Sequence, residues 1–378
     1  MAYETIELDR FERFQEMKND WNALLADSSC RIPFLRHEWL SLWWAHFGPP
    51  NRLAIILVRE GDRLVLAAPL MEVERRRLAC SFRILQSLTN VHSPRFHILV
   101  RTGHEAALDA FWAYVGRRPR HWHLLRLNRL PAGTLQQAVV GRAAASGHAV
   151  ETIPSLTSPY VAINGDWESF RSALKPKFRS NLRNRSRRLQ ALGAVTFQVV
   201  RDTTSAPTAL ETGLAVEASG WKGERGSAIW ADPTLADFYR GLAAAAAAEG
   251  WLRLSFLKVA ERPAAFDLSL VYDDRMYCLK VGYDPEFSPY SAGQLLCQEI
   301  LRTAHEQRAV TYEFLGESSV QKRDWTPEAR EHVGLYAYNR RALSRLHRLH
   351  RFTARRALKR LLPARLVAAI RARSRKDE

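Results

Sequence analysis

The chain has 378 residues, a mass of 43.2 kDa and a formal net charge of +17. This length is typical of two domains, and a content of 47% hydrophobic and 25% charged residues excludes a wholly disordered, collagen-like or coiled-coil chain. The charge is uneven, because residues 171–188 carry +8, residues 340–378 carry +12 and the remainder carries −3. We therefore expect a near-neutral globule with two basic segments, unlike a uniformly basic, histone-like protein.

The four cysteines are too widely spaced for a zinc site or a disulfide framework, so we expect no metal and a reducing compartment. They are Cys30, Cys80, Cys278 and Cys297. The first seven residues contain acids where a signal peptide has a basic and then apolar start. No stretch approaches the ~18 uninterrupted apolar residues of a membrane span. These features predict a cytoplasmic protein.

The first 150 residues predict a mixture of helices and strands. In chain order we expect helices at residues 11–25 and 37–47, a hairpin of strands at 53–58 and 63–71, a strand at 96–100, a helix at 104–115, a strand at 122–127 and a helix ending at Gly147. Residues 151–159 contain two prolines and two serines and predict a connector.

The second half repeats this plan of hairpin, loop, helix and strand. We expect helices at residues 175–192 and 235–249, strands at 251–259, 264–272 and 276–283, a helix at 294–307 and a last strand at 311–315. The two halves share no repeat at the level of residues, so the duplication is one of pattern only.

The loop at residues 288–296 is the most informative segment. Gly293 lies between a strand end and a helix start, where free main-chain N–H groups and the helix dipole form a cradle for an anion such as a pyrophosphate. The alternative is a plain connection between a strand and a helix, because a single glycine motif is a weak signal.

Short motifs before and after this loop occur in a fixed order. In the second half they are Trp221-Lys222-Gly223 with Gly226-Ser227, Gly282-Tyr283-Asp284-Pro285, Ser291-Ala292-Gly293, Phe314-Leu315-Gly316, Lys322 and Trp325, and in the first half they are Pro33-Phe34-Leu35, His37-Glu38-Trp39 and Ala68-Pro69-Leu70. This ordered set, over residues 32–325, resembles the GNAT acyltransferase superfamily. The most similar branch is the CelD-like or Fem-like one, in which two GNAT folds lie in tandem.

The resemblance implies an α+β fold of two tandem GNAT-like domains, each a mainly antiparallel mixed sheet flanked by helices. We expect the first domain at residues 1–153, the second at 160–338, and a basic amphipathic tail at 339–378. By the same resemblance, the acyl-CoA pyrophosphate would be held by Ser291, Ala292, Gly293, Gln294 and Leu295. The loop matches the usual Arg/Gln-x-x-Gly-x-Gly/Ala pattern only at Gly293. Fem-type relatives use aminoacyl-tRNA instead, and that donor stays open.

GNAT chemistry needs a base for the acceptor proton, donors for the oxyanion and an acid for the leaving group. Strand alternation places Asp267 opposite the apolar face of its strand and makes it the first candidate base, with a solvated carboxylate as the alternative. Burial of Glu313 would raise its pKa toward a useful range, unless it forms an ion pair. Tyr283 is a candidate acid for the leaving group.

Four further side chains are candidate substrate ligands. They are Lys280, Tyr290, Lys322 and Trp325. The two lysines suit an acidic group on the substrate, and Tyr290, like Tyr283, flanks the cradle, although both tyrosines could be structural.

The two basic segments have several interpretations. Arg179, Arg183 and Arg187 are spaced by four, so they form a row that could follow the phosphates of tRNA or could be a solvated helix face. The leucines of the tail have helical spacing among arginines, as in a helix that binds an anionic membrane surface, although docking on the protein or disorder would also fit.

His121 and His123 are a possible metal pair, but a surface pair is the favoured interpretation because no third ligand is near in sequence. The leading function is acyl transfer from acyl-CoA to an amine or hydroxyl of a saccharide or lipid precursor of the cell envelope or an exopolysaccharide, in the cytoplasm or at the inner membrane face. The alternatives are aminoacyl-tRNA-dependent transfer, and a non-catalytic accessory role in exopolysaccharide production.

Overall fold

The computed structural model describes residues 3–77, 80–118, 121–220 and 228–354. The motif at residues 221–227 and the tail beyond residue 354 lie outside the described residues. The first half contains β1 (Tyr3–Leu8), α1 (Phe11–Gln15), α2 (Lys18–Ala26), η1 (Pro33–Leu35), α3 (His37–Phe47), β2 (Arg52–Leu53), β3 (Ile55–Glu60), β4 (Arg63–Ala68), β5 (Leu70–Arg77), β6 (Cys80–Ser87), β7 (Leu99–Val100), α4 (Ala107–Arg117), β8 (Leu124–Pro131), α5 (Thr134–Ala145) and β9 (Ala149–Ala162).

The second half continues from the end of β9. It contains α6 (Trp167–Ala173), α7 (Pro176–Gln190), β10 (Val195–Val200), α8 (Ala206–Ser219), η2 (Ile229–Ala231), α10 (Pro233–Ala248), β11 (Leu252–Val259), β12 (Arg262–Tyr272), β13 (Arg275–Tyr283), η3 (Pro285–Tyr290), α11 (Ala292–Glu306), β14 (Thr311–Glu313), α12 (Val320–Arg323), β15 (Ala329–Tyr338), α13 (Ala342–Arg348) and η4 (Leu349–Ala354). Within the described ranges, no helix is both long and apolar enough to cross a membrane.

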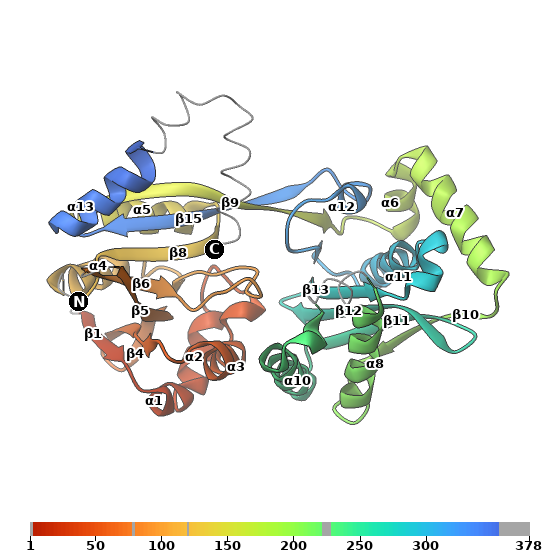
Figure 1. The fold of residues 1–378 in the computed structure, drawn as a ribbon, viewed down its shortest axis with the longest axis horizontal. Helices are drawn as coiled ribbons and strands as arrows, with labels where there is room; N and C mark the ends of the chain where they lie inside the picture. The colour runs from red at the N-terminus through yellow and green to blue at the C-terminus, as the bar shows by residue number, and fades with distance from the viewer. Residues whose placement is uncertain (1–2, 78–79, 119–120, 221–227, 355–378) are drawn as a thin grey trace.

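One sheet of eleven strands runs through both halves, in the order β10-β11-β12-β13-β14-β9-β15-β8-β6-β5-β2. Figure 1 shows the two halves side by side, with β9 extending from one to the other. A second sheet, β1-β3-β4-β7, completes the first half. Most strand pairs are antiparallel, and the helices cover the sheet faces, as the predicted fold class requires.

The prediction of a connector at residues 151–159 is wrong, because these residues belong to the long strand β9. Most of β9 pairs with β15, and its last three residues pair with β14. The two prolines fit in the strand because Pro154 lies beside a register shift and Pro159 lies opposite the first residue of β15. The domain boundaries predicted at residues 153 and 160 both lie within this strand and stay a prediction.

A hydrophobic core shared by both halves holds them together. Trp39 of α3 packs edge-on against Phe238 of α10, with ring centroids 5.5 Å apart, and both belong to one core cluster. A second cluster lies on the other face of the second half, where α7 and α11 cover the sheet. The contact between α3 and α10 therefore makes the halves one packed body.

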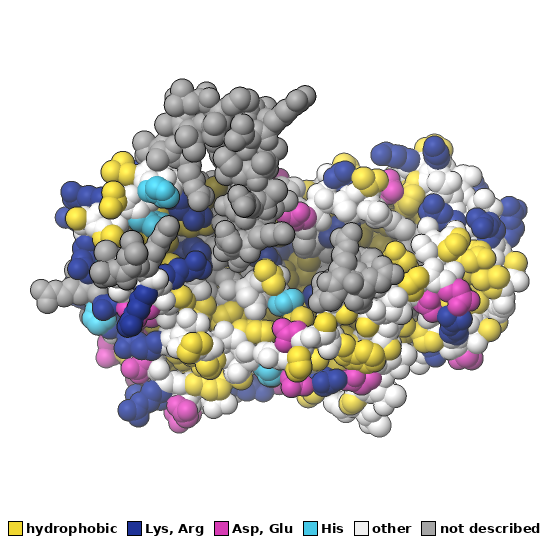
Figure 2. Space-filling view, in the orientation of Figure 1, with side chains coloured by type: hydrophobic (Ala, Val, Ile, Leu, Met, Phe, Trp, Pro, Cys, Tyr) yellow, Lys and Arg dark blue, Asp and Glu magenta, His cyan; other side chains and the backbone are white. Residues whose placement is uncertain are grey.

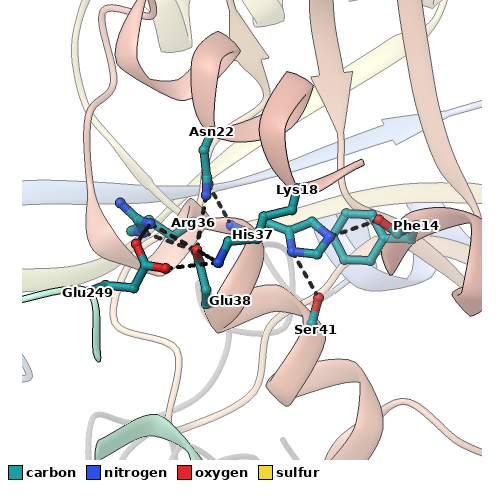
Figure 3. A network of polar contacts seen from close by, with 8 residues as sticks. All are labelled: Phe14, Lys18, Asn22, Arg36, His37, Glu38, Ser41 and Glu249. Carbon is teal, nitrogen blue, oxygen red and sulfur yellow. Dashed lines mark hydrogen bonds and ion pairs between the residues drawn. The ribbon is translucent and has the colours of Figure 1, made fainter. Parts of the chain in front are cut away.

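An ionic network reinforces this contact (Figure 3). Glu249, just beyond α10, accepts hydrogen bonds from Lys18 at 2.8 Å and Arg36 at 2.9 Å. Arg36 also binds Glu38, whose pKa it holds at about 2 although burial alone would raise that pKa. His37 contacts the main-chain oxygen of Phe14. The first-half motif around these residues thus serves the junction between the halves.

Gly282 allows β13 to approach α8 closely. A Cβ atom at this position would lie 2.6 Å from the Cα atom of Glu217, a main-chain atom that cannot relieve the clash by side-chain rotation. We expect Gly282→Ala to lower the free energy of unfolding by about 1–3 kcal/mol. The control is Gly141→Ala in α5, where a Cβ meets nothing within 4 Å and helix propensity adds about 1 kcal/mol of stability. Urea unfolding should show a lower free energy of unfolding for Gly282→Ala and a higher one for Gly141→Ala. Equal changes in the two variants would contradict the close approach of β13 to α8.

Candidate active site

A cavity opens where β13 and β14 separate. These parallel strands pair only through Arg275–Tyr277 and Thr311–Glu313, after which they diverge. The space between them has a volume of about 550 Å³ and is lined by residues 278–283 of β13, the start of α11 and the segment that follows β14. The splayed strands therefore form a slot that is closed at one end by their last shared pair.

A β-bulge lies at the closed end of this slot. Leu268 of β12 faces Lys280 and Ser269 faces Cys278, so Leu279 is an extra residue on β13. A bulge leaves one residue outside the hydrogen-bonded ladder and bends the strand. The extra residue here, Leu279, lines the cavity. The sequence analysis did not predict this feature, because nothing in local composition marks it.

The predicted cradle lies at the mouth of the slot. Ser291 adopts a left-handed conformation (φ 53°, ψ 48°) and turns the chain from η3 into α11. The N–H groups of Ala292 and Gly293 form no main-chain hydrogen bond within the described residues, as is usual in a first helical turn. A Cβ atom on Gly293 would lie 3.8 Å from Tyr283, so the space before this turn is open.

Not every residue of the predicted donor loop faces the cavity. Ser291, Ala292, Gly293 and Gln294 line it, whereas Leu295 is buried in the hydrophobic cluster beneath α11. The difference follows from helical geometry, because successive residues of the first turn point to different sides.

Trp325 holds the start of α11 in place. Its indole N–H donates to Oε1 of Gln294 at 2.5 Å, and the other end of that amide donates to the main-chain oxygen of Gln321. Phe178 of α7 packs edge-on against the Trp325 ring at 4.9 Å. Trp325 therefore lines the cavity and also ties α7, α11 and the loop before β15 together.

The two candidate lysines lie on opposite walls of the cavity. Lys322 donates to the main-chain oxygens of Leu315 at 2.6 Å and Glu317 at 3.0 Å, and burial lowers the pKa of its amine. Lys280 lies 3.4 Å from Nδ1 of His92, which belongs to the first half. Lys322 thus braces the loop after β14, and Lys280 marks the place where the cavity meets the first half.

Asp267 lies beneath the cavity floor rather than in it. Its side chain faces α11, opposite the apolar residues of β12, as strand alternation predicted. It is only 1% exposed, so the alternative of a solvated carboxylate is wrong. Burial raises its pKa to about 6, although Ser269 donates to one carboxylate oxygen at 2.5 Å and the Cys278 thiol to the other at 3.1 Å.

Three residues that the sequence analysis did not assign complete the floor. Cys278, Cys297 and Tyr312 all line the cavity. Burial raises the pKa of both thiols and of the phenol. Cys278 lines the cavity and its thiol donates to Asp267, so this thiol connects the buried carboxylate to the cavity.

Glu313 has the ion pairs that were its alternative interpretation. One oxygen accepts from Arg95 at 2.6 Å and the other from Arg330 at 2.9 Å. Burial alone would raise the pKa of this carboxyl, but the two guanidinium groups hold it below its usual range. The ion pairs therefore keep the pKa of Glu313 from rising toward a useful range, and Glu313 joins the halves because Arg95 belongs to the first half.

The two tyrosines differ in their surroundings. Tyr283 lines the cavity, close to the first turn of α11. Tyr290, in η3, is not among the lining residues, and the guanidinium of Arg188 lies over its ring at 5.2 Å. Tyr290 therefore connects the cradle to the basic helix α7.

Comparisons with known proteins agree with this fold. Residues 176–323 match a family model described as an acetyltransferase (GNAT) domain. Among solved structures, FemX superposes with a TM-score of 0.61 at 12% identity over 89% of this chain and 97% of its own. A conserved protein of unknown function from Bacteroides thetaiotaomicron superposes with a TM-score of 0.52 at 11% identity over 89% and 100%. A search of curated proteins gave no match.

The family match covers α7, the strands β12, β13 and β14, and the start of α11. The likeness to FemX extends over both halves. The fold class and the resemblance stated from the sequence are confirmed. Residues 176–323 form a GNAT-type acyltransferase domain.

Proposed function

We propose that this chain transfers an acyl group from acyl-CoA to an amine or hydroxyl acceptor. The observation that carries the proposal is the slot between β13 and β14, which ends at the free N–H groups of the first turn of α11. A helix start binds phosphate oxygens, and a slot of about 550 Å³ has room for a thioester arm. The diphosphate would lie at Ala292 and Gly293, and the thioester near the bulge at Leu279.

In this arrangement the acceptor's lone pair attacks the thioester carbon while the carbon–sulfur bond breaks. Main-chain N–H groups at the bulge would stabilise the oxyanion. The acceptor's proton would pass through the Cys278 thiol to Asp267, and the Tyr283 hydroxyl would protonate the leaving thiolate. Glu313 has a positioning role, because both of its oxygens are already bound by guanidinium groups.

The acceptor would enter from the first half. Lys280 lines the cavity and contacts His92, so the wall of the slot is continuous with the junction of the halves. Lys280 suits a substrate with an acidic group, consistent with a saccharide or lipid precursor of the cell envelope or an exopolysaccharide. A basic helix after β15 would place such an enzyme at the inner membrane face.

Two substitutions of Gly293 test the donor site. We expect the parent protein to bind acetyl-CoA with micromolar affinity in a calorimetric titration, and Gly293→Trp to abolish this binding because the ring would fill the slot. Gly293→Ala is the matched control, since its methyl group makes only an ordinary contact with Tyr283 and should leave affinity within about threefold. Equal binding by the parent and Gly293→Trp would place the nucleotide elsewhere.

Aminoacyl-tRNA is the second candidate donor, and α7 favours it. This helix carries Lys175 at its start and Lys177, Arg179, Arg183, Arg185, Arg187 and Arg188 along its length, and within the described residues none of them pairs with a carboxylate. Figure 2 shows Lys and Arg side chains gathered at the edge of the molecule where Figure 1 draws α7. A helix of 15 residues is about 22 Å long, which exceeds the span of the CoA phosphates and suits an RNA backbone.

Salt dependence separates the candidates. A tRNA donor predicts binding that weakens steeply between about 50 and 200 mM salt, because a protein with several phosphate contacts releases counterions on binding. Arg183→Gln with Arg187→Gln would weaken this binding further. The acyl-CoA proposal predicts that this pair of substitutions leaves acetyl-CoA affinity unchanged. Absence of any acetyl-CoA or tRNA binding at millimolar ligand would favour the accessory role in exopolysaccharide production.

A further inference from the structure

A second cleft lies at the far end of the first half, where β6, β8 and β15 meet the start of α13. It is lined by Ser81, Arg83, His123, Arg341, Ala342 and Leu343 and has a volume of about 550 Å³. These residues belong to three separate segments of the chain. In Figure 1 this end of the molecule is remote from α11 and the splayed strands, so the cleft is separate from the donor cavity.

Hydrogen bonds position the strands and helix that form the cleft. His123 donates its main-chain N–H to the oxygen of Arg83 at 2.8 Å, and Asn339 donates its own to the oxygen of His123. The Asn339 side chain in turn accepts from the N–H of Arg341 at 3.1 Å and from the hydroxyl of Ser344 at 2.6 Å. The strand ends and the start of α13 are thus held in one arrangement.

His123 offers one defined donor to this cleft. It is 95% buried, and its ring stacks on Phe82 with centroids 5.0 Å apart. The main-chain N–H of Arg83 donates to Nδ1 at 3.0 Å, so the neutral ring carries its proton on Nε2. Burial, together with Arg341 and Arg83, lowers the pKa of His123, which keeps the ring neutral. Within the described residues Nε2 has no hydrogen-bond partner.

His123 is therefore not half of a metal pair. His121 lines a different cavity, beside Glu7 and Glu72. In the part of the chain that the structure describes, no group of three or more His, Cys, Asp or Glu side chains could hold a metal ion.

Two arginines line the cleft together with His123, and the charge of both acts on its ring. Arg83 interacts with other groups, Glu74 among them at 4.0 Å, and Arg341 forms no ion pair within the described residues. An N–H donor and two arginines in one cleft match the oxygens of a phosphate group, which accept several hydrogen bonds and carry negative charge.

The surface beside the cleft is apolar. Leu346 is 63% exposed and Leu349 is 55% exposed, one and two turns beyond the cleft. Figure 2 shows hydrophobic, basic and histidine side chains next to one another over α13. Residues 340–354 contain five arginines and no acid. Exposed leucines among arginines are typical of a helix that lies on an anionic bilayer.

We propose that this cleft binds the phosphate of an anionic phospholipid, with His123, Arg83 and Arg341 as ligands, while Leu346 and Leu349 enter the acyl boundary. A soluble phosphate ester has the same phosphate chemistry but would leave the leucines without a partner. The proposal goes beyond acyl transfer, and it does not depend on which donor occupies the other cavity.

Vesicle sedimentation of the full chain tests this proposal. We expect binding to vesicles of phosphatidylglycerol and phosphatidylcholine but not to phosphatidylcholine alone, and about tenfold weaker binding for Arg83→Gln with Arg341→Gln. A separate variant, Leu346→Ser, should also weaken binding. The matched control removes two charges from the other basic segment, Arg183→Gln with Arg187→Gln, and should bind like the parent. Acetyl-CoA affinity should be the same in all four proteins.

Two results would overturn the proposal. One is equal loss of vesicle binding in the two double variants, because net charge alone would then explain the attraction. The other is calorimetric binding of sn-glycerol 3-phosphate by the parent without any vesicle binding, which would identify a soluble phosphate ester as the ligand. Unfolding temperatures of the variants show whether a loss of binding reflects a loss of folded protein.

Discussion

Replacing Arg95 by Met should lower the free energy of unfolding by about 3–5 kcal/mol. Arg95 is 5% exposed and Glu313 is 1% exposed, and their side chains meet at 2.6 Å across the junction of the halves. The variant would leave the buried Glu313 carboxylate with Arg330, which is itself partly exposed, as its only charged partner among the described residues. Removing one partner of a buried ion pair destabilises a protein by more than the intact pair stabilises it, because the remaining charge is left buried without its counter-charge.

Double substitution provides the control for Arg95. Arg95→Met with Glu313→Gln removes both charges and should recover most of the lost stability in urea unfolding. Arg330→Met should cost less than Arg95→Met, because Arg330 stands at the edge of the site. A double variant as unstable as Arg95→Met would show that the loss comes from packing and not from the unpaired carboxylate.

Asp267→Asn should make the protein more stable at pH 8 and change it little at pH 4. The pKa of Asp267 rises from about 3.8 to about 6 on folding because the carboxyl is buried. The protonated Asp267 carboxyl therefore makes its full contribution to stability below pH 3.8, and this contribution is lost as the pH rises through about 6. A shift of this size corresponds to about 3 kcal/mol at pH 8, where the folded protein must hold a buried charge.

Thermal unfolding of parent and variant at both pH values measures this difference. Asp237→Asn, on the exposed face of α10, is the control and should change stability by less than about 0.5 kcal/mol at either pH. A difference for Asp267→Asn that is independent of pH, or a loss of stability at pH 8, would contradict the burial of an ionised carboxylate. Loss of acyl transfer in the same variant would agree with its proposed role as proton acceptor.

Much of the second half could be predicted because its signals are local. Alternating apolar residues identified β11, β12 and β13, and their parity placed Asp267 on the correct face. A glycine between a strand and a helix located the start of α11. Each of these features depends on neighbours within a few residues, which a single sequence displays.

The remaining features depend on partners that are distant in sequence. Arg95 and Glu313 are 218 residues apart, so no spacing rule joins them. Strand β15 pairs with β8 and β9 because the chain returns to the first half after α11, whereas the prolines and serines of β9 suggested a connector. The proton position on His123 depends on a main-chain donor 40 residues away. Such features become visible only in the folded chain.

A crystal structure with bound acetyl-CoA would test the central claim most directly. The account predicts the diphosphate within hydrogen-bond distance of the N–H groups of Ala292 and Gly293, and the thioester between β13 and β14 beside Leu279 and Cys278. Acetyl-CoA bound elsewhere, with the slot between these strands empty, would contradict it.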